Sequence, residues 1–326
     1  MRLNYPLIIL VLLGGCLSSC YRKALIIQAS AEGCMIPESS FLYDSLLAVK
    51  NSLYETDTLD CAKILQNRFS LRSSNIAQDM QMIPLLCKFA KQEKNNTNPS
   101  EFIQTKVEIQ QQILVSITDL NSLLSEITCE RERMQELYDA LNGQISKRIN
   151  KATVYSIIAG GLTTIIAAVI AIKGNEDVPY YEQGIGITGA VAGTYWGFRS
   201  ISQKSKIKFL HFRNHLTDIW LQQSWSHIYS PYIWNYLSKP FTLKGKTTNR
   251  LELVLNKWEE LELPLAKDDR KYEQKLHLML GMGGDYTLED LENRIKMYEI
   301  LVDEIITINY DLNRLQEEIM LGFKIH

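Results

Sequence analysis

The feature that most restricts how this chain can fold is a long apolar segment without a single charge. Residues 152–172 are rich in Ile, Ala, Val and Leu, and as a helix they would span roughly 30 Å, the thickness of the hydrocarbon layer of a bilayer. A polar connection, residues 173–182, separates this segment from a second uncharged one, residues 184–198. The pair predicts a hydrophobic helical hairpin of the transmembrane type over residues 151–198. A hairpin buried in a protein core is the alternative.

Three glycines of the second segment, Gly189, Gly193 and Gly197, follow one another at intervals of four residues. On a helix such glycines form a smooth face that another helix backbone can approach closely, a common arrangement in membranes. We therefore expect these glycines and the neighbouring Trp196 to belong to the membrane-binding part of the protein.

Two long helices are predicted to bracket the hairpin, over residues 100–150 and 285–326. Thr287 and Asp290 have the spacing of a capping box at the start of the second helix. In both helices apolar residues recur every three or four positions, which is typical of a coiled-coil seam. The first seam holds Ile113, Ile117, Leu120, Leu124, Ile127, Met134, Tyr138, Leu141 and Ile145, and the second Leu288, Leu291, Ile295, Tyr298, Val302, Ile305, Leu312, Leu315 and Ile319. The pattern predicts an all-α fold with an antiparallel coiled-coil stalk.

A smaller helical region is expected before the stalk, within residues 20–99. Amphipathic patterns predict helices over residues 41–54, 59–71 and 73–94, after a short tether. Pro84 lies inside the third pattern, where it predicts a kink or a break, because proline removes a helical hydrogen bond.

The N-terminal residues resemble a bacterial lipoprotein signal peptide. Arg2 supplies a positive charge, residues 7–13 form a short apolar run, and residues 17–20 read Leu-Ser-Ser-Cys. The resemblance implies that residues 1–19 are removed and that the thiol of Cys20 carries a lipid. Cys16 closes a poorer second match, and a plain apolar anchor helix is the alternative. By this resemblance the protein lies in the bacterial cell envelope, facing the periplasm or the exterior.

Four further cysteines, Cys34, Cys61, Cys87 and Cys129, would then lie in an oxidising compartment. They allow three disulfide pairings, and none has the spacing of a metal site. We expect structural disulfides or buried thiols.

The segment after the hairpin is basic and aromatic. Between residues 183 and 251 the only acidic residue is Asp218, against nine basic residues. Basic side chains are attracted to anionic lipid, and tryptophan and tyrosine settle near headgroups. The aromatic residues of this segment include Trp220, Trp225, Tyr229, Tyr232, Trp234 and Tyr236. We therefore expect residues 199–284 to form a membrane-proximal helical region, with Arg199, Lys204, Lys206 and Lys208 contacting the membrane. Nucleic acid is the alternative partner of such a segment, but the predicted export and the net charge of −2 disfavour it.

The charges around the hairpin conflict with the export signal. Positive residues normally stay in the cytoplasm, yet they flank the base of the hairpin, while the loop between its arms is acidic. Either the hairpin enters a different membrane, or it stays within a soluble fold until insertion, or the protein is not exported.

The order of long helix, apolar hairpin and long helix resembles the layout of α-helical pore-forming toxins of the xenorhabdolysin and haemolysin BL type. The resemblance covers residues 100–325 and concerns arrangement alone, because no motif is shared. It implies paired helices that form a stalk and a central apolar segment that inserts into a membrane.

Catalytic motifs are weak. Residues 245–248 read Gly-Lys-Thr-Thr, the end of a phosphate-binding loop, but Pro240 occupies the position of its first glycine. A basic turn before a helix near Asn249 is the better interpretation. His211 and His215 have the spacing of zinc ligands on one helix face but no third ligand, and the glycines of residues 281–284 indicate a hinge between two helices.

The sequence therefore predicts a non-enzymatic, lipid-anchored envelope protein with a structural or scaffolding role, without cofactor or metal. Pore formation in a target membrane is the alternative. The expected partners are membrane lipids with anionic headgroups, together with a second copy of the chain or another envelope protein, and not nucleic acid.

Overall fold

The computed structural model describes Cys34 and residues 58–94, 98–173, 205–211, 213–243, 245–264, 267 and 269–321. The chain divides into two compact units. Unit 1 comprises Met1–Gln28 and Leu141–Lys208, and unit 2 comprises Ala29–Ala140 and Phe209–His326. Apart from Cys34, the predicted tether lies outside the described residues, as do the lipobox with Cys20, the helix expected over residues 41–54 and the second apolar segment.

The described residues are mostly helical, as predicted. The helices are α3 (Thr58–Arg68), α4 (Leu71–Asp79), α5 (Ile83–Lys94), α6 (Pro99–Lys173), α8 (His215–Leu221), α9 (Pro231–Ser238), α10 (Arg250–Glu260), α11 (Tyr272–Leu280) and α12 (Leu288–Leu321). Pro84 breaks the pattern of residues 73–94 as expected, because it falls in the first turn of α5, where a missing N–H is tolerated.

Four short strands were not predicted. They are β1 (Ile207–Leu210), β2 (Phe241–Leu243), β3 (Lys246–Thr248) and β4 (Gly283–Tyr286), and they pair as β1 with β4 and β2 with β3. The β2–β3 hairpin is antiparallel and turns at Gly245, whose φ of +80° favours glycine. The all-α expectation therefore needs this correction: segments of three or four residues are too short to show a strand pattern in the sequence.

Helix α6 contains 75 residues and continues without interruption through residue 150, where the hairpin was expected to begin. In unit 2, Thr105 and Glu126 are buried, and the other buried positions of α6 keep a spacing of four and three residues. They are Ile109, Ile113, Ser116, Leu120, Leu123, Ile127, Glu130, Met134 and Leu137. The predicted positions are only partly correct: Ser116, Leu123 and Leu137 are buried, whereas the predicted Ile117, Leu124, Tyr138 and Ile145 are half-buried.

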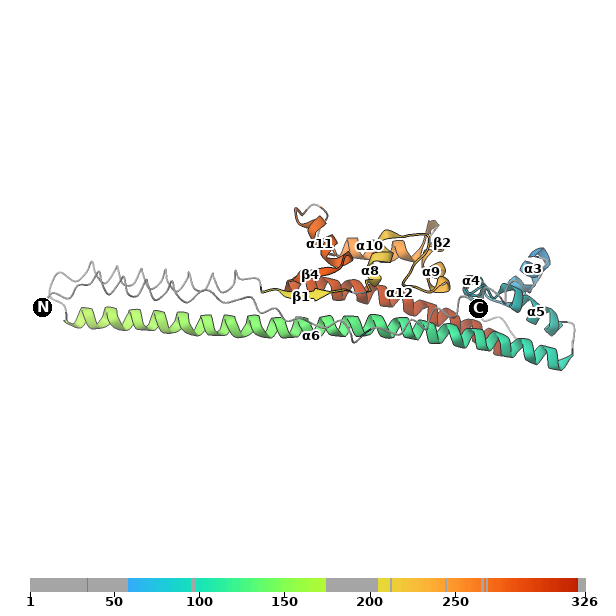
Figure 1. The fold of residues 1–326 in the computed structure, drawn as a ribbon, viewed down its shortest axis with the longest axis horizontal. Coiled ribbons are helices and arrows are strands. Elements are labelled where there is room, and N and C mark those ends of the chain that lie inside the picture. The colour runs from blue at the N-terminus through green and yellow to red at the C-terminus, as the bar shows by residue number, and fades with distance from the viewer. Residues whose placement is uncertain are drawn as a thin grey trace. The chain divides into compact units, whose positions relative to one another are not determined.

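Helix α12 begins at the predicted capping box. Thr287 Oγ1 accepts a hydrogen bond from the Asp290 backbone N–H at 3.3 Å, and Asp290 Oδ2 accepts one from the Thr287 N–H at 2.9 Å. Nine of its buried positions lie at heptad spacing, namely Leu291, Arg294, Tyr298, Leu301, Ile305, Ile308, Leu312, Leu315 and Ile319. Asp290, Ile295, Met297, Asp311 and Glu318 are also buried, and the predicted Leu288 and Val302 are half-buried. Within unit 2, α12 runs alongside α6 in the opposite direction (Figure 1).

The core of unit 2 takes up most of the aromatic residues that we expected at headgroup level. Tyr229, Tyr232, Trp234 and Tyr236 are buried, and Trp220 is half-buried. Tyr232 donates a hydrogen bond to the Ser116 carbonyl of α6 at 2.5 Å, and Tyr236 donates one to Asp311 of α12 at 2.7 Å. Their hydroxyls therefore have partners inside the protein, which corrects the prediction for these residues. Trp225 remains exposed.

Candidate functional site

A buried polar cluster lies in unit 2 where α6 meets the segment between β1 and α8. Glu126 and Glu130, one turn apart on α6, face His215 and His211 respectively. The distance from Glu126 Oε1 to His215 Nε2 is 3.5 Å, and that from Glu130 Oε1 to His211 Nδ1 is 3.6 Å. All four side chains are buried. The chain places them there because both glutamates lie on the inward side of α6 and the β1–α8 segment crosses it.

Arginines accompany both glutamates. Arg213 Nη1 donates to Glu126 Oε2 at 3.0 Å, and Arg133 Nη1 donates to Glu130 Oε2 at 3.4 Å. Arg294 of α12 is fully buried and donates to Asn214 Oδ1 at 3.1 Å and to the Tyr298 hydroxyl at 3.2 Å. The carboxylates are thus surrounded by cations, the condition under which a buried charge is tolerated.

The neighbours set the ionisation of this cluster. Burial, followed by the charge of Arg294, lowers the pKa of His211 to about 4. Burial opposes ionisation of Glu130, but its contacts with His211, Arg294 and Arg133 outweigh it and lower the pKa of Glu130. At neutral pH, His211 is therefore neutral and Glu130 is charged. His211 Nε2 lies 2.6 Å from the hydroxyl of Tyr286 on β4, which in turn donates to the Leu278 carbonyl.

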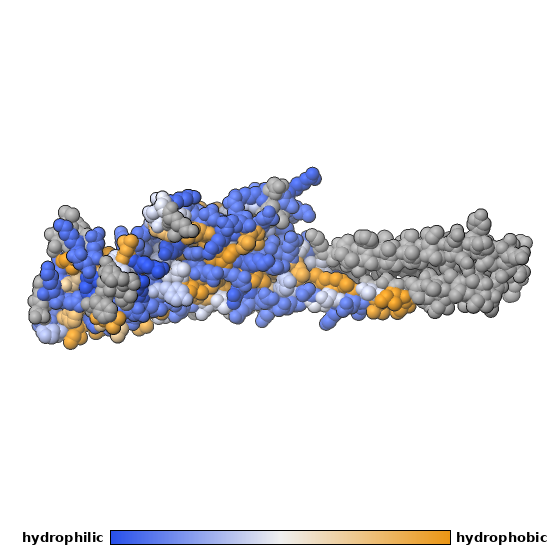
Figure 2. Space-filling model, turned by 180° about the vertical axis from the view of Figure 1, so that it is seen from behind, coloured by the Kyte–Doolittle hydropathy of each residue, from blue (hydrophilic) through white to orange (hydrophobic). Residues whose placement is uncertain are grey.

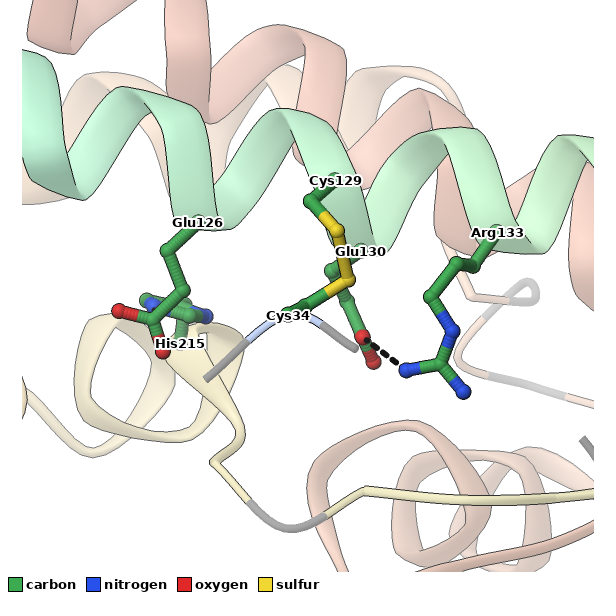
Figure 3. The surroundings of a disulfide bond; sticks show 6 residues. All are labelled: Cys34, Glu126, Cys129, Glu130, Arg133 and His215. Carbon is green, nitrogen blue, oxygen red and sulfur yellow. Dashed lines mark hydrogen bonds and ion pairs between the residues drawn. A yellow bond between two sulfur atoms is a disulfide. The ribbon is translucent and has the colours of Figure 1, made fainter. Parts of the chain in front are cut away.

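A disulfide joins this cluster to the N-terminal part of the chain. Cys129 lies between the two glutamates on α6 and is bonded to Cys34, with an S–S distance of 2.04 Å. Figure 3 shows Glu126, Cys129, Glu130 and Arg133 pointing to the same side of α6. The second disulfide, Cys61–Cys87, joins α3 to α5. The pairing, which the sequence left open, is therefore 34 with 129 and 61 with 87.

The cluster of buried glutamates, histidines and arginines packs unit 2 and compensates the buried charges. His211 and His215 do not share a helix face, since His211 follows β1 and His215 begins α8. Across the described residues, no group of three or more His, Cys, Asp or Glu side chains is arranged to hold a metal ion. Lys246–Thr248 form β3, and Asn249 caps α10 through a capping box with Glu252, as the basic-turn interpretation predicted. The glycines expected to form a hinge lie instead around strand β4.

Sequence reasoning missed the glutamates of this cluster. Glu130 occupies a core position of the heptad in α6, between Ile127 and Met134. Burying an acidic residue at such a position is costly unless it is paired. A glutamate where the heptad pattern expects an apolar residue was therefore the signal in the sequence for a buried polar cluster.

The predicted membrane-binding residues are only partly described. Lys208 on β1 and Lys206, which directly precedes the strand, are exposed, while Ile207 and Phe209 are buried. The other predicted residues, Gly189, Gly193, Trp196, Gly197, Arg199 and Lys204, lie outside the described residues.

On α6, the exposed basic residues Lys147, Arg148 and Lys151 are followed by exposed apolar ones. Val154, Ile157 and Ile158 are 53, 68 and 51% exposed. Figure 2 shows an apolar stretch on this part of the helix. Among the described residues, no helix is both long enough and apolar enough to cross a membrane. No family model matches the sequence, and no match is found among curated proteins or solved structures.

Proposed function

We propose that this chain is a non-enzymatic, lipid-anchored protein of the bacterial envelope with a scaffolding role. In this proposal, unit 2 is a disulfide-linked helical body, and the apolar part of α6 together with residues 184–198 enters a lipid bilayer. The antiparallel pairing of α6 with α12 as a coiled coil belongs to the same proposal.

The observation that carries the proposal is the exposure of apolar side chains on α6 in unit 1. Val154, Ile157 and Ile158 lie on a helix that continues through Lys173, and residues 152–172 contain no charge. Each of these three aliphatic side chains is more than half exposed. Removing such a side chain from water is favourable by about 1 kcal/mol or more. A lipid environment would cover them without a specific partner.

The disulfides support export. Disulfides persist in the periplasm and outside the cell, and are rare in the reducing cytosol. Cys34 lies 14 positions after Cys20, so the crosslink to Cys129 would attach the lipid-bearing end of the chain directly to α6.

The test compares two triple substitutions on the same helix. One replaces Val154, Ile157 and Ile158 by Asp, and the control replaces Ile103, Val107 and Leu114, which are also exposed, by Asp. Both are made in a Cys20→Ala chain that is exported behind a cleavable signal, so that neither an acyl chain nor an uncleaved signal retains the protein. We expect the parent and the control to resist carbonate extraction from native membranes and the first variant to be extracted. Extraction of all three proteins alike would contradict the proposal.

Pore formation is the second candidate function, because the layout resembles that of helical pore-forming toxins. It differs in one measurable consequence: the purified protein would release dye from vesicles in a size-limited manner. A scaffold would bind the same vesicles without releasing dye.

A further inference from the structure

We infer that unit 1 carries a binding surface for anionic phospholipid headgroups, formed jointly by α6 and the chain that leads into β1. The surface consists of Lys147, Arg148, Lys151, Lys206 and Lys208, hereafter the basic cluster. This inference rests on the proposed function and names the lipid class that the protein meets.

A hydrogen bond brings the two parts of the basic cluster together. Arg148 Nη1 donates to Ser205 Oγ at 2.8 Å, although the two residues are 57 positions apart in the chain. Lys206 follows Ser205 directly, and Lys208 shares the outward side of the strand with Lys206. On α6, Lys147 and Lys151 lie within one turn of Arg148. Both basic segments therefore converge on the Arg148–Ser205 contact.

The two segments that form the cluster contain no acidic residue, although β4, which pairs with β1, carries the exposed Asp285. Residues 140–175 contain no aspartate or glutamate, and neither do residues 205–210. All five basic side chains are exposed. Five exposed positive charges on two segments without acidic residues fit a surface with a high density of phosphate groups, and each contributes roughly 1 kcal/mol near an anionic bilayer.

The order of residues along α6 identifies that surface as a lipid bilayer. Lys147, Lys151, Val154 and Ile158 follow one another at helical intervals of four, three and four, so they share one face. Lys151 and Val154 are separated by about 4.5 Å along the helix axis, comparable with a headgroup layer of about 5 to 7 Å. A face that changes from basic to apolar over this distance matches the change from headgroups to hydrocarbon.

Nucleic acid would also attract the basic side chains, but it would leave the adjoining apolar residues uncovered. The exposed apolar side chains of this face therefore favour the bilayer. An anionic lipid satisfies both kinds of residue with one partner.

The experiment measures vesicle flotation of the mature chain, which begins at position 20 and carries Cys20→Ala. Phosphatidylglycerol-containing vesicles are compared with pure phosphatidylcholine vesicles. One variant carries Lys147→Gln, Lys151→Gln, Lys206→Gln and Lys208→Gln. The control carries the same change at four exposed lysines of unit 2, namely Lys63, Lys94, Lys246 and Lys271. Arg148 is kept, so that its bond to Ser205 remains.

We expect the parent to prefer the anionic vesicles, with binding that weakens as salt is added. The cluster variant should lose about fivefold in affinity for them per lysine removed, whereas the control should lose little. Equal affinity of the cluster variant and the parent for anionic vesicles would overturn the inference. Equal binding of the parent to both vesicle types would also overturn the inference, but it would remain consistent with the proposed function. A parent that binds neither would contradict both.

Discussion

Cys34 is bonded to Cys129, 95 positions further along the chain, and their Cα atoms lie 5.7 Å apart. Crosslinks that close long loops restrict the unfolded chain most, and removing one costs about 2 to 5 kcal/mol. We expect Cys34→Ala with Cys129→Ala to lower the free energy of unfolding of the folded protein by this amount, measured by urea denaturation. The matched control removes Cys61 and Cys87, which close a loop of 26 residues. Because its loop is smaller, removing the Cys61–Cys87 bond should lower the free energy of unfolding less than removing the Cys34–Cys129 bond. A larger loss for the Cys61–Cys87 variant would contradict this account.

The buried histidine makes stability depend on pH. The pKa of His211 is lowered from 6.5 to about 4 in the fold, so the unfolded chain takes up the proton first as the pH falls. The stability linked to His211 is complete above about pH 6.5 and is lost progressively down to about pH 4. The lowered pKa of Glu130 acts in the same direction, below its ordinary value of 4.5.

We therefore expect the free energy of unfolding to fall between pH 6.5 and 4, and His211→Gln to flatten this dependence. Glutamine retains a donor near the Tyr286 hydroxyl but does not titrate. Urea denaturation at several pH values measures the slope, and His227→Gln, at a histidine outside the cluster, is the control. A slope in the His211→Gln variant as steep as in the parent would refute the assignment.

Gly283 lies where only glycine fits. Its φ is +85°, and a Cβ atom would stand 2.3 Å from the Phe209 carbonyl oxygen on β1. We expect Gly283→Ala to lower the free energy of unfolding by about 2 kcal/mol or more, through strain and the clash with β1. Gly143 is the control, because it lies on α6 with open space around it. Gly143→Ala should raise stability by about 0.5 to 1 kcal/mol, and thermal denaturation of both variants would show whether the effects have opposite signs.

Lipid attachment should depend on Cys20. The residues 17–20 predict that Cys20→Ala abolishes the incorporation of labelled fatty acid and leaves a precursor with its signal attached. Cys16→Ala is the control and should be labelled normally. Labelling that disappears with Cys16 instead would move the attachment site to the second match.

The sequence was a good guide where one pattern decides the structure. The Thr287–Asp290 capping box was enough to predict the start of α12, and the recurring apolar residues were enough to predict two long helices. Periodicity reports which residues share a face, and these helices bury one face along most of their length in unit 2.

Other features depend on contacts between distant residues. Apart from Arg133, which lies one turn from Glu130 on α6, the partners of Glu126 and Glu130 come from a segment more than 80 positions away. Strands β1 and β4 stabilise each other across the chain, although each is too short to be recognised alone. Trp234 and Tyr236 look equally suited to a core and to a bilayer interface, and only the packing of α9 places them in the core.

The central claim is that the apolar part of α6 enters lipid, and a single label can test it. Ile157 and Leu114 are similarly exposed, at 68 and 63%, and lie on the same helix. Each is replaced by Cys in the mature Cys20→Ala chain, whose four other cysteines are in disulfides, and labelled with an environment-sensitive fluorophore. In the presence of vesicles, the label at position 157 should shift to shorter wavelength and be quenched by nitroxide-bearing lipids, while the label at 114 should remain in water. A label at 157 that stays in water, with the protein bound to the vesicles, would contradict the account.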